Sequence, residues 1–537
     1  MNSWYLKDDV ILEPLVCNWF AWPFLISPLT AAAYLTKKYL PMLESYIQEP
    51  LLHDEAFKNK TIRAASFIRN DSSLEFMKQH FAELKMKLKR MVELSESIDE
   101  VNRVMLDRRG MSLASIYELL PASLKGKIEL VYDLNHSPSI RFVECFFYRS
   151  AYFDPKLQSI RLRQCSTQNS DFAINSPMFN NLGVVVDVQF DSYFVDLLGR
   201  SRWAPINLEE LCDLVPMSVE NKQKIRELFT ETRPRTLDNA TEDDTALRIK
   251  YFGHACLSVE YPNFTILTDP VMSAPMGGDH RPRYSYSDLP AHIDLVLITH
   301  NHQDHVVIDC LIQLRERIGT IVVPKSGGGF LQDPSLKLLF ESLGFKKIVE
   351  IGEMETLHFG DLKITGVPFL GEHGEINIQS KVGFHITDDR KSILVLADSD
   401  VVDLDIYKSV HNICGDVDIV FIGLDSIGAP FRWLYSSLYS SKLDYKIGSD
   451  RRINGSNSQK ALQIVDIFHP IAAFPYAMGL EPWISHITGS DTSNDNQATI
   501  EVGDFLRGCY ARGIHSRELY WMDLITVPSV GNAISNL

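Results

Sequence analysis

The sequence predicts two domains: an α+β domain over residues 1–240, followed by an αββα sandwich over residues 241–537. Its length of 537 residues exceeds the roughly 100–200 residues of an ordinary domain. The pattern changes along the chain from mainly helical to short β-rich runs. Between these parts, the stretch Thr230–Thr245 contains Pro234 and an acidic cluster and has no periodicity. We therefore expect the linker there.

The first domain is expected to be mostly helical over residues 30–135. Within that range, Leu74–Val101 carries apolar residues at helical spacing between Lys and Glu residues. The runs Arg141–Tyr148 and Val184–Val195 are rich in aromatic and β-branched residues, which predicts strands.

One uncharged run, Leu15–Thr36, is long enough to raise the question of a membrane span. Pro23 and Pro28 interrupt it, acidic residues precede it, and no basic segment of a signal peptide is present. We expect buried structure here and no membrane association. The eight scattered cysteines form no C-x-x-C pair, which is typical of a reducing compartment and predicts a cytoplasmic protein.

The second domain is predicted to consist of layered sheets covered by helices. Helix-like segments, such as Ile308–Ile318 and Pro334–Leu343, lie between some of its β-rich runs. These runs are Leu247–Phe252, Cys256–Glu260, Phe264–Thr268, Asp294–Thr299, Thr320–Val323, Ile348–Ile351, Lys363–Val367, Val382–Ile386, Ile393–Ala397 and Ile419–Ile422.

Composition narrows the possible partners. The chain has 53 Lys and Arg against 69 Asp and Glu, a formal net charge of −16. Nucleic acid binding needs clustered basic residues that contact phosphates, so no nucleic acid partner is expected.

The strongest chemical feature follows the strand predicted at Asp294–Thr299. Three imidazoles and one carboxylate occur within six residues: His300, His302, Asp304 and His305. Imidazole suits zinc, iron, copper or nickel, so the motif predicts a site for two metal ions without naming the metal. A solvated polar loop is the alternative, and four ligand-type residues so close together make it the weaker one.

This H-x-H-x-D-H motif is that of the metallo-β-lactamase fold, and the chain from about residue 246 onward resembles that superfamily. Gly253–Cys256 and Thr268–Pro270 look like the opening strands of its members. Asp398, after the strand Ile393–Ala397, matches the carboxylate that bridges the two metals.

The resemblance also implies a further histidine ligand late in the domain. His486 fits that position, whereas His469 sits before Pro470 at the edge of an apolar run, where a structural role is expected. A structural role is expected for His254 as well, because the superfamily has no ligand at that position.

The loop Gly371-Glu372-His373 contains two candidates, Glu372 and His373, for one remaining ligand position. With His373 the set is that of a dizinc hydrolase. With Glu372 it has four imidazoles and three carboxylates, and an anionic ligand favours iron over zinc. The spacing alone does not choose between these neighbours.

The N-terminal motifs identify a narrower resemblance. Trp4-Tyr5, Glu13–Val16, Trp19–Trp22 and Leu25–Pro28 look like the start of the diiron β-hydroxylases of nonribosomal peptide biosynthesis, a branch found in antibiotic pathways. The resemblance covers essentially the whole chain. In that branch the glutamate of the Gly-Glu-His loop binds iron, which implies Glu372.

By this resemblance the protein is a monooxygenase. It is expected to hydroxylate the β-carbon of an amino acid held as a thioester on a peptidyl carrier domain of a nonribosomal peptide synthetase. It would use two irons, O2 and an external electron donor, supplied by an unidentified reductase, and no flavin, haem or 2-oxoglutarate. The implied metal ligands are His300, His302, Asp304, His305, Glu372, Asp398 and His486, with Glu372 and Asp398 also catalytic.

Two further expectations complete the prediction. The N-terminal domain is expected to shape the active site and to mediate a homodimer. The aromatic run Trp433–Tyr439 is expected to pack in the core, with a substrate pocket as the alternative. The alternative function is a dizinc hydrolase of a thioester, phosphodiester or amide, with a metal-bound hydroxide as nucleophile.

Overall fold

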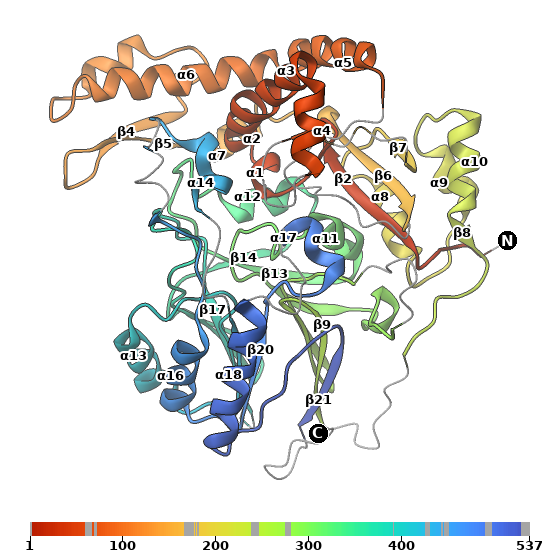
Figure 1. The fold of residues 1–537 in the computed structure, drawn as a ribbon, viewed down its shortest axis with the longest axis vertical. Helices are drawn as coiled ribbons and strands as arrows, with labels where there is room; N and C mark the ends of the chain where they lie inside the picture. Colours follow the sequence, from red (N-terminus) through yellow and green to blue (C-terminus); the bar gives the residue numbers. More distant parts are fainter. Residues whose placement is uncertain are drawn as a thin grey trace.

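The computed structural model describes residues 3–58, 67–68, 72–165, 177, 179, 182–237, 246–273, 281–389, 391–424, 430–441, 444, 450–488 and 497–527. The domain boundary predicted between residues 240 and 241 lies outside these residues. Figure 1 shows helices and a small sheet of the first half packed above a sandwich of two sheets.

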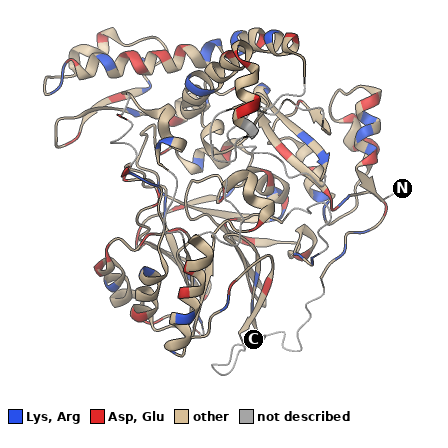
Figure 2. Cartoon of the chain, in the orientation of Figure 1, with Lys and Arg blue, Asp and Glu red and all other residues tan. Residues whose placement is uncertain are grey.

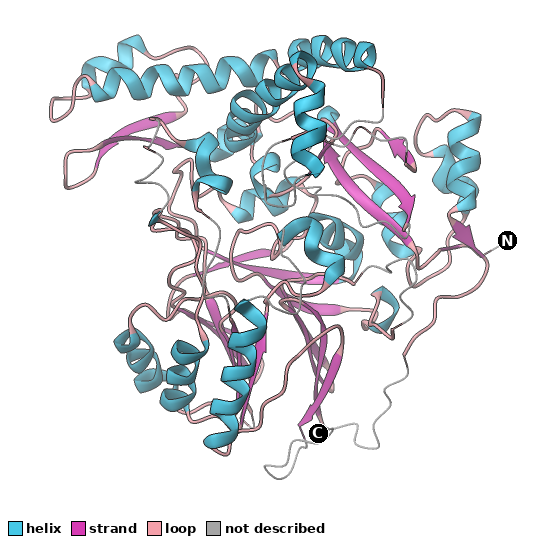
Figure 3. Cartoon of the chain, in the orientation of Figure 1, coloured by secondary structure: helices cyan, strands magenta, loops and turns pink. Residues whose placement is uncertain are grey.

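Two sheets stacked face to face form the second half of the described chain (Figure 3). The first has the order β14-β13-β12-β11-β10-β9-β21 and the second the order β15-β16-β17-β18-β19-β20. Their bounds are β9 (Leu247–Gly253), β10 (Cys256–Tyr261), β11 (Phe264–Thr268), β12 (Ile293–Leu297), β13 (Ile318–Pro324), β14 (Ile348–Ile351), β15 (Thr356–Phe359), β16 (Leu362–Val367), β17 (Gly383–Thr387), β18 (Ser392–Val395), β19 (Ile419–Gly423), β20 (Ala472–Tyr476) and β21 (Asp523–Val527).

Both faces of the sheets are apolar, and side chains alternate between them. On β19, Ile419 and Phe421 enter the core between the sheets, whereas Val420 and Ile422 enter a core beneath outer helices. Those helices are α13 (Leu404–Cys414), α16 (Ser458–Phe468) and α18 (Gln497–Ala511). On the opposite side, α11 (Ile308–Leu314) and α12 (Leu336–Ser342) cover the first sheet. The predicted αββα sandwich is confirmed.

The first half is an α+β domain whose largest sheet has the order β3-β2-β6-β7. Acidic and basic residues are both spread along its outer helices α5 (Leu74–Lys87) and α6 (Lys89–Leu106) (Figure 2). Its strands are β1 (Tyr5–Leu6), β2 (Val10–Val16), β3 (Trp19–Phe20), β4 (Ile128–Tyr132), β5 (Pro138–Phe142), β6 (Gln158–Gln164), β7 (Val184–Val186) and β8 (Phe229–Thr230). Its helices are α1 (Pro23–Ile26), α2 (Pro28–Tyr34), α3 (Leu40–Gln48), α4 (Pro50–Lys58), α5 (Leu74–Lys87), α6 (Lys89–Leu106), α7 (Glu144–Tyr148), α8 (Tyr193–Arg200), α9 (Leu208–Asp213) and α10 (Val219–Glu227).

Two strands predicted in this domain are wrong over most of their length. In Arg141–Tyr148, strand β5 ends at Phe142 and α7 follows. In Val184–Val195, β7 ends at Val186 and α8 begins at Tyr193. Aromatic residues favour strands only weakly, and here each helix buries an apolar face in the shared core.

The uncharged run at Leu15–Thr36 is buried structure, as expected. Each proline begins a short helix, α1 at Pro23 and α2 at Pro28, because proline is tolerated at the first helical position. Every residue of both helices is buried. Among the described helices, none has the length and apolar character needed to cross a membrane.

Candidate metal centre

All of the predicted ligands except His486 converge at one edge of the sandwich, because they follow the carboxyl ends of strands. His300 follows β12, Glu372 follows β16, and Asp398 follows β18. Strand β12 is parallel to β11, whose end carries Asp269. Carboxyl ends that point the same way bring side chains from distant parts of the sequence together.

The first cluster joins His300, His302 and Glu372, whose ligand atoms lie within 4.8 Å of one another. His302 Nδ1 is 3.0 Å from Glu372 Oε1. On the other side of the ring, His302 Nε2 is 2.6 Å from the hydroxyl of Tyr435. If that hydroxyl accepts a hydrogen bond from Nε2–H, the lone pair of Nδ1 is left free to bind a metal.

The second cluster joins His300, His305 and Asp398. His305 Nε2 is 3.0 Å from Asp398 Oδ2, and its Nδ1 is 2.8 Å from Asp269 Oδ2. Asp269 also accepts hydrogen bonds from the backbone N–H and the hydroxyl of Thr299, at 2.8 and 2.6 Å. A carboxylate behind a histidine fixes its tautomer, so Asp269 directs His305 Nε2 towards the metal position.

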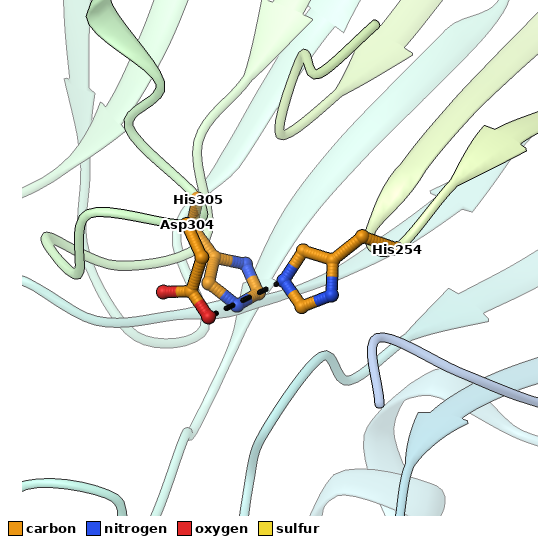
Figure 4. A group of neighbouring side chains, drawn as sticks. All are labelled: His254, Asp304 and His305. Carbon is orange, nitrogen blue, oxygen red and sulfur yellow. Dashed lines mark ion pairs between the residues drawn. The ribbon is translucent and has the colours of Figure 1, made fainter. Parts of the chain in front are cut away.

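The remaining carboxylate, Asp304, points towards His254 (Figure 4). His254 Nε2 lies 3.4 Å from Asp304 Oδ2. The backbone N–H of Gly479 donates to His254 Nδ1 at 3.2 Å, so a neutral ring carries its proton on Nε2. His254 Nε2 forms no hydrogen bond within the described structure, and His254 groups with Asp304 and His305 as side chains able to hold a metal ion, so its structural role stays a prediction.

The loop that carries Glu372 has an unusual backbone. Glu372 adopts φ 64°, in the left-handed region that non-glycine residues rarely occupy. Its N–H donates to the carbonyl of Asn454 at 3.0 Å, which holds this conformation. The preceding Gly371 has φ 73°, and a Cβ there would lie 2.5 Å from that of Asp400. Such strain is maintained where the surroundings and the function require it.

His373 packs against the first cluster, with its ring centroid 4.5 Å from that of His302, but it belongs to none of the ligand groups among the described residues. It is fully buried, with Nε2 3.4 Å from Asn301 Oδ1 and Nδ1 3.4 Å from the carbonyl of Gly371. Burial lowers its pKa well below the usual value, so it is a neutral ring inside the fold. Of the two neighbours in this loop, the structure groups Glu372 with the other ligands.

His486 does not lie with the other predicted ligands. It belongs to α17 (Ser485–Thr488), where its Nδ1 donates to the carbonyl of Trp483 at 2.9 Å. Its ring packs edge-on against Phe20 of β3, with centroids 5.9 Å apart. Burial lowers its pKa to about 4. Among the described residues, it belongs to none of the groups able to hold a metal ion.

The pKa values of the cluster suit metal ligation. Burial lowers the pKa of His300 well below its usual value and that of His302 to about 4, so both rings are neutral, as ligands must be. Burial also disfavours a charge on His305, but Asp398 and Asp269 raise its pKa well above the usual value.

Buried polar atoms without a partner test whether metals fit. His300 Nε2 and Asp398 Oδ1 are buried and form no hydrogen bond within the described structure. Such atoms are costly unless something binds them. Three imidazoles and three carboxylates converge here, and a mixed set of this kind fits iron. The residues present therefore fit two iron ions.

Two residues of the site, Asp269 and Tyr435, are not predicted as functional groups from the sequence. Asp269 is part of the run Thr268–Pro270, which resembles the opening strands of the superfamily. Tyr435 lies in the aromatic run expected to pack in the core, and it does pack there, fully buried. Its hydroxyl nevertheless reaches His302. A carboxylate directly after a strand is a signal that could have identified Asp269, whereas no local pattern distinguishes Tyr435 from its aromatic neighbours.

Comparison with known proteins agrees with this geometry. Residues 5–234 match the N-terminal domain of the diiron non-haem β-hydroxylases, and residues 265–427 match the β-lactamase superfamily domain. The chain is 33% identical to the 4-amino-L-phenylalanyl-[CmlP-peptidyl-carrier-protein] 3-hydroxylase of Streptomyces venezuelae, over 96% of this chain and 98% of that protein.

A solved structure extends the similarity to three dimensions. The crystal structure of CmlA, a diiron β-hydroxylase from Streptomyces venezuelae, superposes with a TM-score of 0.90 at 31% identity. It covers 97% of this chain and 99% of that one. A Glu-to-Asp variant of the CmlA β-hydroxylase superposes with a TM-score of 0.88. The likeness includes both domains, which favours the hydroxylase over the hydrolase alternative. The chain therefore belongs to the family of non-haem diiron β-hydroxylases with a metallo-β-lactamase-fold catalytic domain.

Proposed function

We propose that this enzyme hydroxylates the β-carbon of an amino acid held as a thioester on a peptidyl carrier domain of a nonribosomal peptide synthetase. Family membership carries the reaction type, since the chain is a non-haem diiron monooxygenase that uses O2 and external electrons. The form of the substrate is supported by the relative, whose name specifies an aminoacyl group on a carrier protein. Tethering raises the effective concentration of a substrate at the site.

The ligand assignment we propose contains six residues of this chain. His300, His302 and Glu372 would hold one iron, and Asp304 and His305 the other, with Asp398, which groups with His300 and His305, between them. When bound, the irons supply the activation of O2. One oxygen atom enters the C–H bond and the other leaves as water, which requires two electrons and two protons from outside the substrate.

The residues themselves control access and charge. The side chains of His300 and His305 are fully buried, whereas those of Asp304 and Asp398 are 16% exposed. Substrate and O2 would therefore approach on the side of these two aspartates. Glu372 adds a negative charge where the zinc hydrolases have a neutral imidazole, and this charge stabilises oxidised iron.

The N-terminal domain would shape the centre through Tyr435. Phe24 packs edge-on against the Tyr435 ring, with centroids 5.9 Å apart, and the Tyr34 hydroxyl donates to the carbonyl of Leu434. Helices α1 and α2 thus support a side chain that contacts His302. We also propose that this domain mediates a homodimer. A cytoplasmic location is supported by the eight cysteines, none of which forms a disulfide.

The deciding experiment supplies iron-loaded enzyme with isotopically labelled O2, a chemical reductant and carrier domains loaded with different amino acids. We expect one labelled oxygen atom on the β-carbon of one loaded amino acid, detected by mass spectrometry. The same amino acid in free form should be unchanged. Comparable hydroxylation of the free amino acid would contradict the tethered substrate, and thioester cleavage without oxygen incorporation would contradict the reaction.

Variants of the loop Gly371-Glu372-His373 test the ligand assignment. Glu372→His recreates the ligand type of the hydrolases, so it should increase the ratio of bound zinc to iron and abolish hydroxylation. His373→Ala should retain two irons per chain, because its nitrogens face Asn301 and Gly371. Elemental analysis of both proteins distinguishes the two residues. Loss of iron in His373→Ala with retention in Glu372→Ala would reverse the assignment.

A further inference from the structure

A second group of metal-type ligands lies on the outer helical layer of the sandwich. It consists of His411 in the last turn of α13, Asp416 in the loop that follows, and His469 at the end of α16. Helices α13 and α16 lie side by side (Figure 1). The three side chains are 28%, 66% and 64% exposed, so an ion from solvent can reach them.

The two rings share one carboxylate oxygen. His411 Nε2 forms a hydrogen bond to Asp416 Oδ1 at 2.7 Å, and His469 Nδ1 forms one to the same oxygen at 3.0 Å. One ligand atom from each residue lies within 4.8 Å of the other two. Ligands bound at about 2.1 Å from a zinc ion stand roughly 3.0–3.4 Å apart. Shifts of a few tenths of an ångström would make room for such an ion.

The surrounding backbone favours a cation at this point. The carboxyl end of a helix carries a partial negative charge, and both α13 and α16 end here. The Asp416 carboxylate adds a full negative charge between the two rings. A divalent ion at this point would meet both helix ends and the carboxylate together.

We propose that His411, Asp416 and His469 form a binding site for a divalent transition metal ion, with zinc as the physiological candidate. Two imidazoles and one carboxylate suit zinc, copper or nickel and not magnesium or calcium. The ion would connect the carboxyl ends of α13 and α16 and leave its remaining positions to water. The site shares no residue with the iron ligands and does not depend on the proposed hydroxylation.

The test uses the full-length, iron-loaded enzyme and Zn²⁺ alone as the probe. After equilibrium dialysis against zinc, elemental analysis gives the zinc and iron bound per chain. We expect one zinc beyond the retained irons in the wild type. His411→Ala, His469→Ala and Asp416→Asn should each weaken that binding by more than about tenfold, since even the loss of groups that only support ligands costs roughly 10–100-fold.

The matched control is His292→Ala. His292 is 63% exposed and lies 3.6 Å from Asp294, which is an exposed histidine–carboxylate pair without a second imidazole. This variant should bind zinc as the wild type does. Zinc should also raise the melting temperature of the wild type and the control but not of the three site variants, because an ion that binds only the folded state stabilises it.

Three results would overturn the proposal. The wild type could bind no zinc beyond the amount that replaces iron. The site variants could bind as much zinc as the wild type, which would mean adsorption elsewhere. His292→Ala could lose as much zinc as His411→Ala, which would mean that any exposed pair of a histidine and a carboxylate suffices. Circular dichroism of each variant checks that it is folded, and Asp416→Asn provides a variant in which side-chain size is unchanged.

Discussion

Two clusters of buried charged or ionisable groups lie in the two halves of this molecule. They differ in whether their buried polar atoms find hydrogen-bond partners within the cluster. In the N-terminal domain, Glu13 on β2 accepts hydrogen bonds from Arg161 and Arg163 on β6, at 2.5 and 3.0 Å. All three side chains are at most 7% exposed. In the catalytic domain, the side chains of His300, His302 and His305 are at most 5% exposed, but His300 Nε2 and Asp398 Oδ1 have no hydrogen-bond partner in the described structure.

The difference shows how a structural cluster can be told from a binding one. Burial alone would raise the pKa of Glu13, but the two arginines lower it, and the group forms a closed network. In the metal centre, burial instead keeps His300 and His302 neutral, and lone pairs point into a shared space. A cluster that leaves buried acceptors unsatisfied is built around an ion from outside.

The largest expected effect is the loss of iron from the catalytic cluster. His305→Ala removes a ring held between Asp269 and Asp398, so we expect less than two irons per chain and no hydroxylation. His486→Ala is the matched control, because it also removes a histidine, here a half-buried one that lies outside the cluster. Elemental analysis of both variants, with circular dichroism to confirm folding, measures the effect. Full iron in His305→Ala, or iron loss confined to His486→Ala, would contradict the assignment.

Breaking the Glu13 cluster should lower the free energy of unfolding and leave the amount of bound iron unchanged. Glu13→Gln leaves two buried guanidinium groups without their anion, and the loss of one partner in a buried pair costs about 3–5 kcal/mol. Denaturant unfolding of both proteins measures this difference. The control is Glu316→Gln, which breaks the half-exposed pair with Arg200 and should cost about 0–1 kcal/mol. Equal costs in the two variants would show that burial does not distinguish the pairs.

The contact between the two domains predicts a pH effect. Burial raises the pKa of Glu144 from 4.5 to about 7. The hydrogen bond that its carboxylate accepts from the backbone N–H of Ser335, the residue before α12, opposes this shift. The folded state therefore keeps this proton to higher pH than the unfolded state does, and stability falls as pH rises through that interval. Each pKa unit corresponds to about 1.4 kcal/mol, so the loss reaches about 3 kcal/mol.

Glu144→Gln should remove this part of the pH dependence. The free energy of unfolding, measured at about pH 5 and about pH 8, should fall less in the variant than in the wild type. A variant that loses as much stability as the wild type over this range would show that Glu144 does not titrate there.

A smaller effect is expected from the support of a ligand. Tyr435→Phe removes the hydroxyl on His302 Nε2, so iron affinity or activity should fall roughly 10–100-fold, with a shift in the diferric absorption spectrum. Tyr439→Phe is the control, since its hydroxyl is buried and forms no hydrogen bond in the described structure. Equal changes in both variants would mean that packing of the aromatic cluster, and not the hydrogen bond, supports the site.

The sequence by itself determined the αββα sandwich and the metal-binding motif, because both depend on local patterns. A short, continuous apolar run such as that of β19 predicts a strand buried on both faces, and His300 to His305 lie within six residues after one strand. Local propensity failed at α7, where burial of an apolar face outweighed the strand preference of aromatic residues.

Only the tertiary structure decided which groups complete the site. Glu372 and His373 are neighbours, and the left-handed backbone at Glu372 turns its carboxylate towards His302 while His373 faces Asn301. Asp269 and Tyr435 reach their histidines from 36 and 133 residues away. Separations of this size carry no periodicity, so the contacts exist only once the strand ends and the N-terminal helices have packed together.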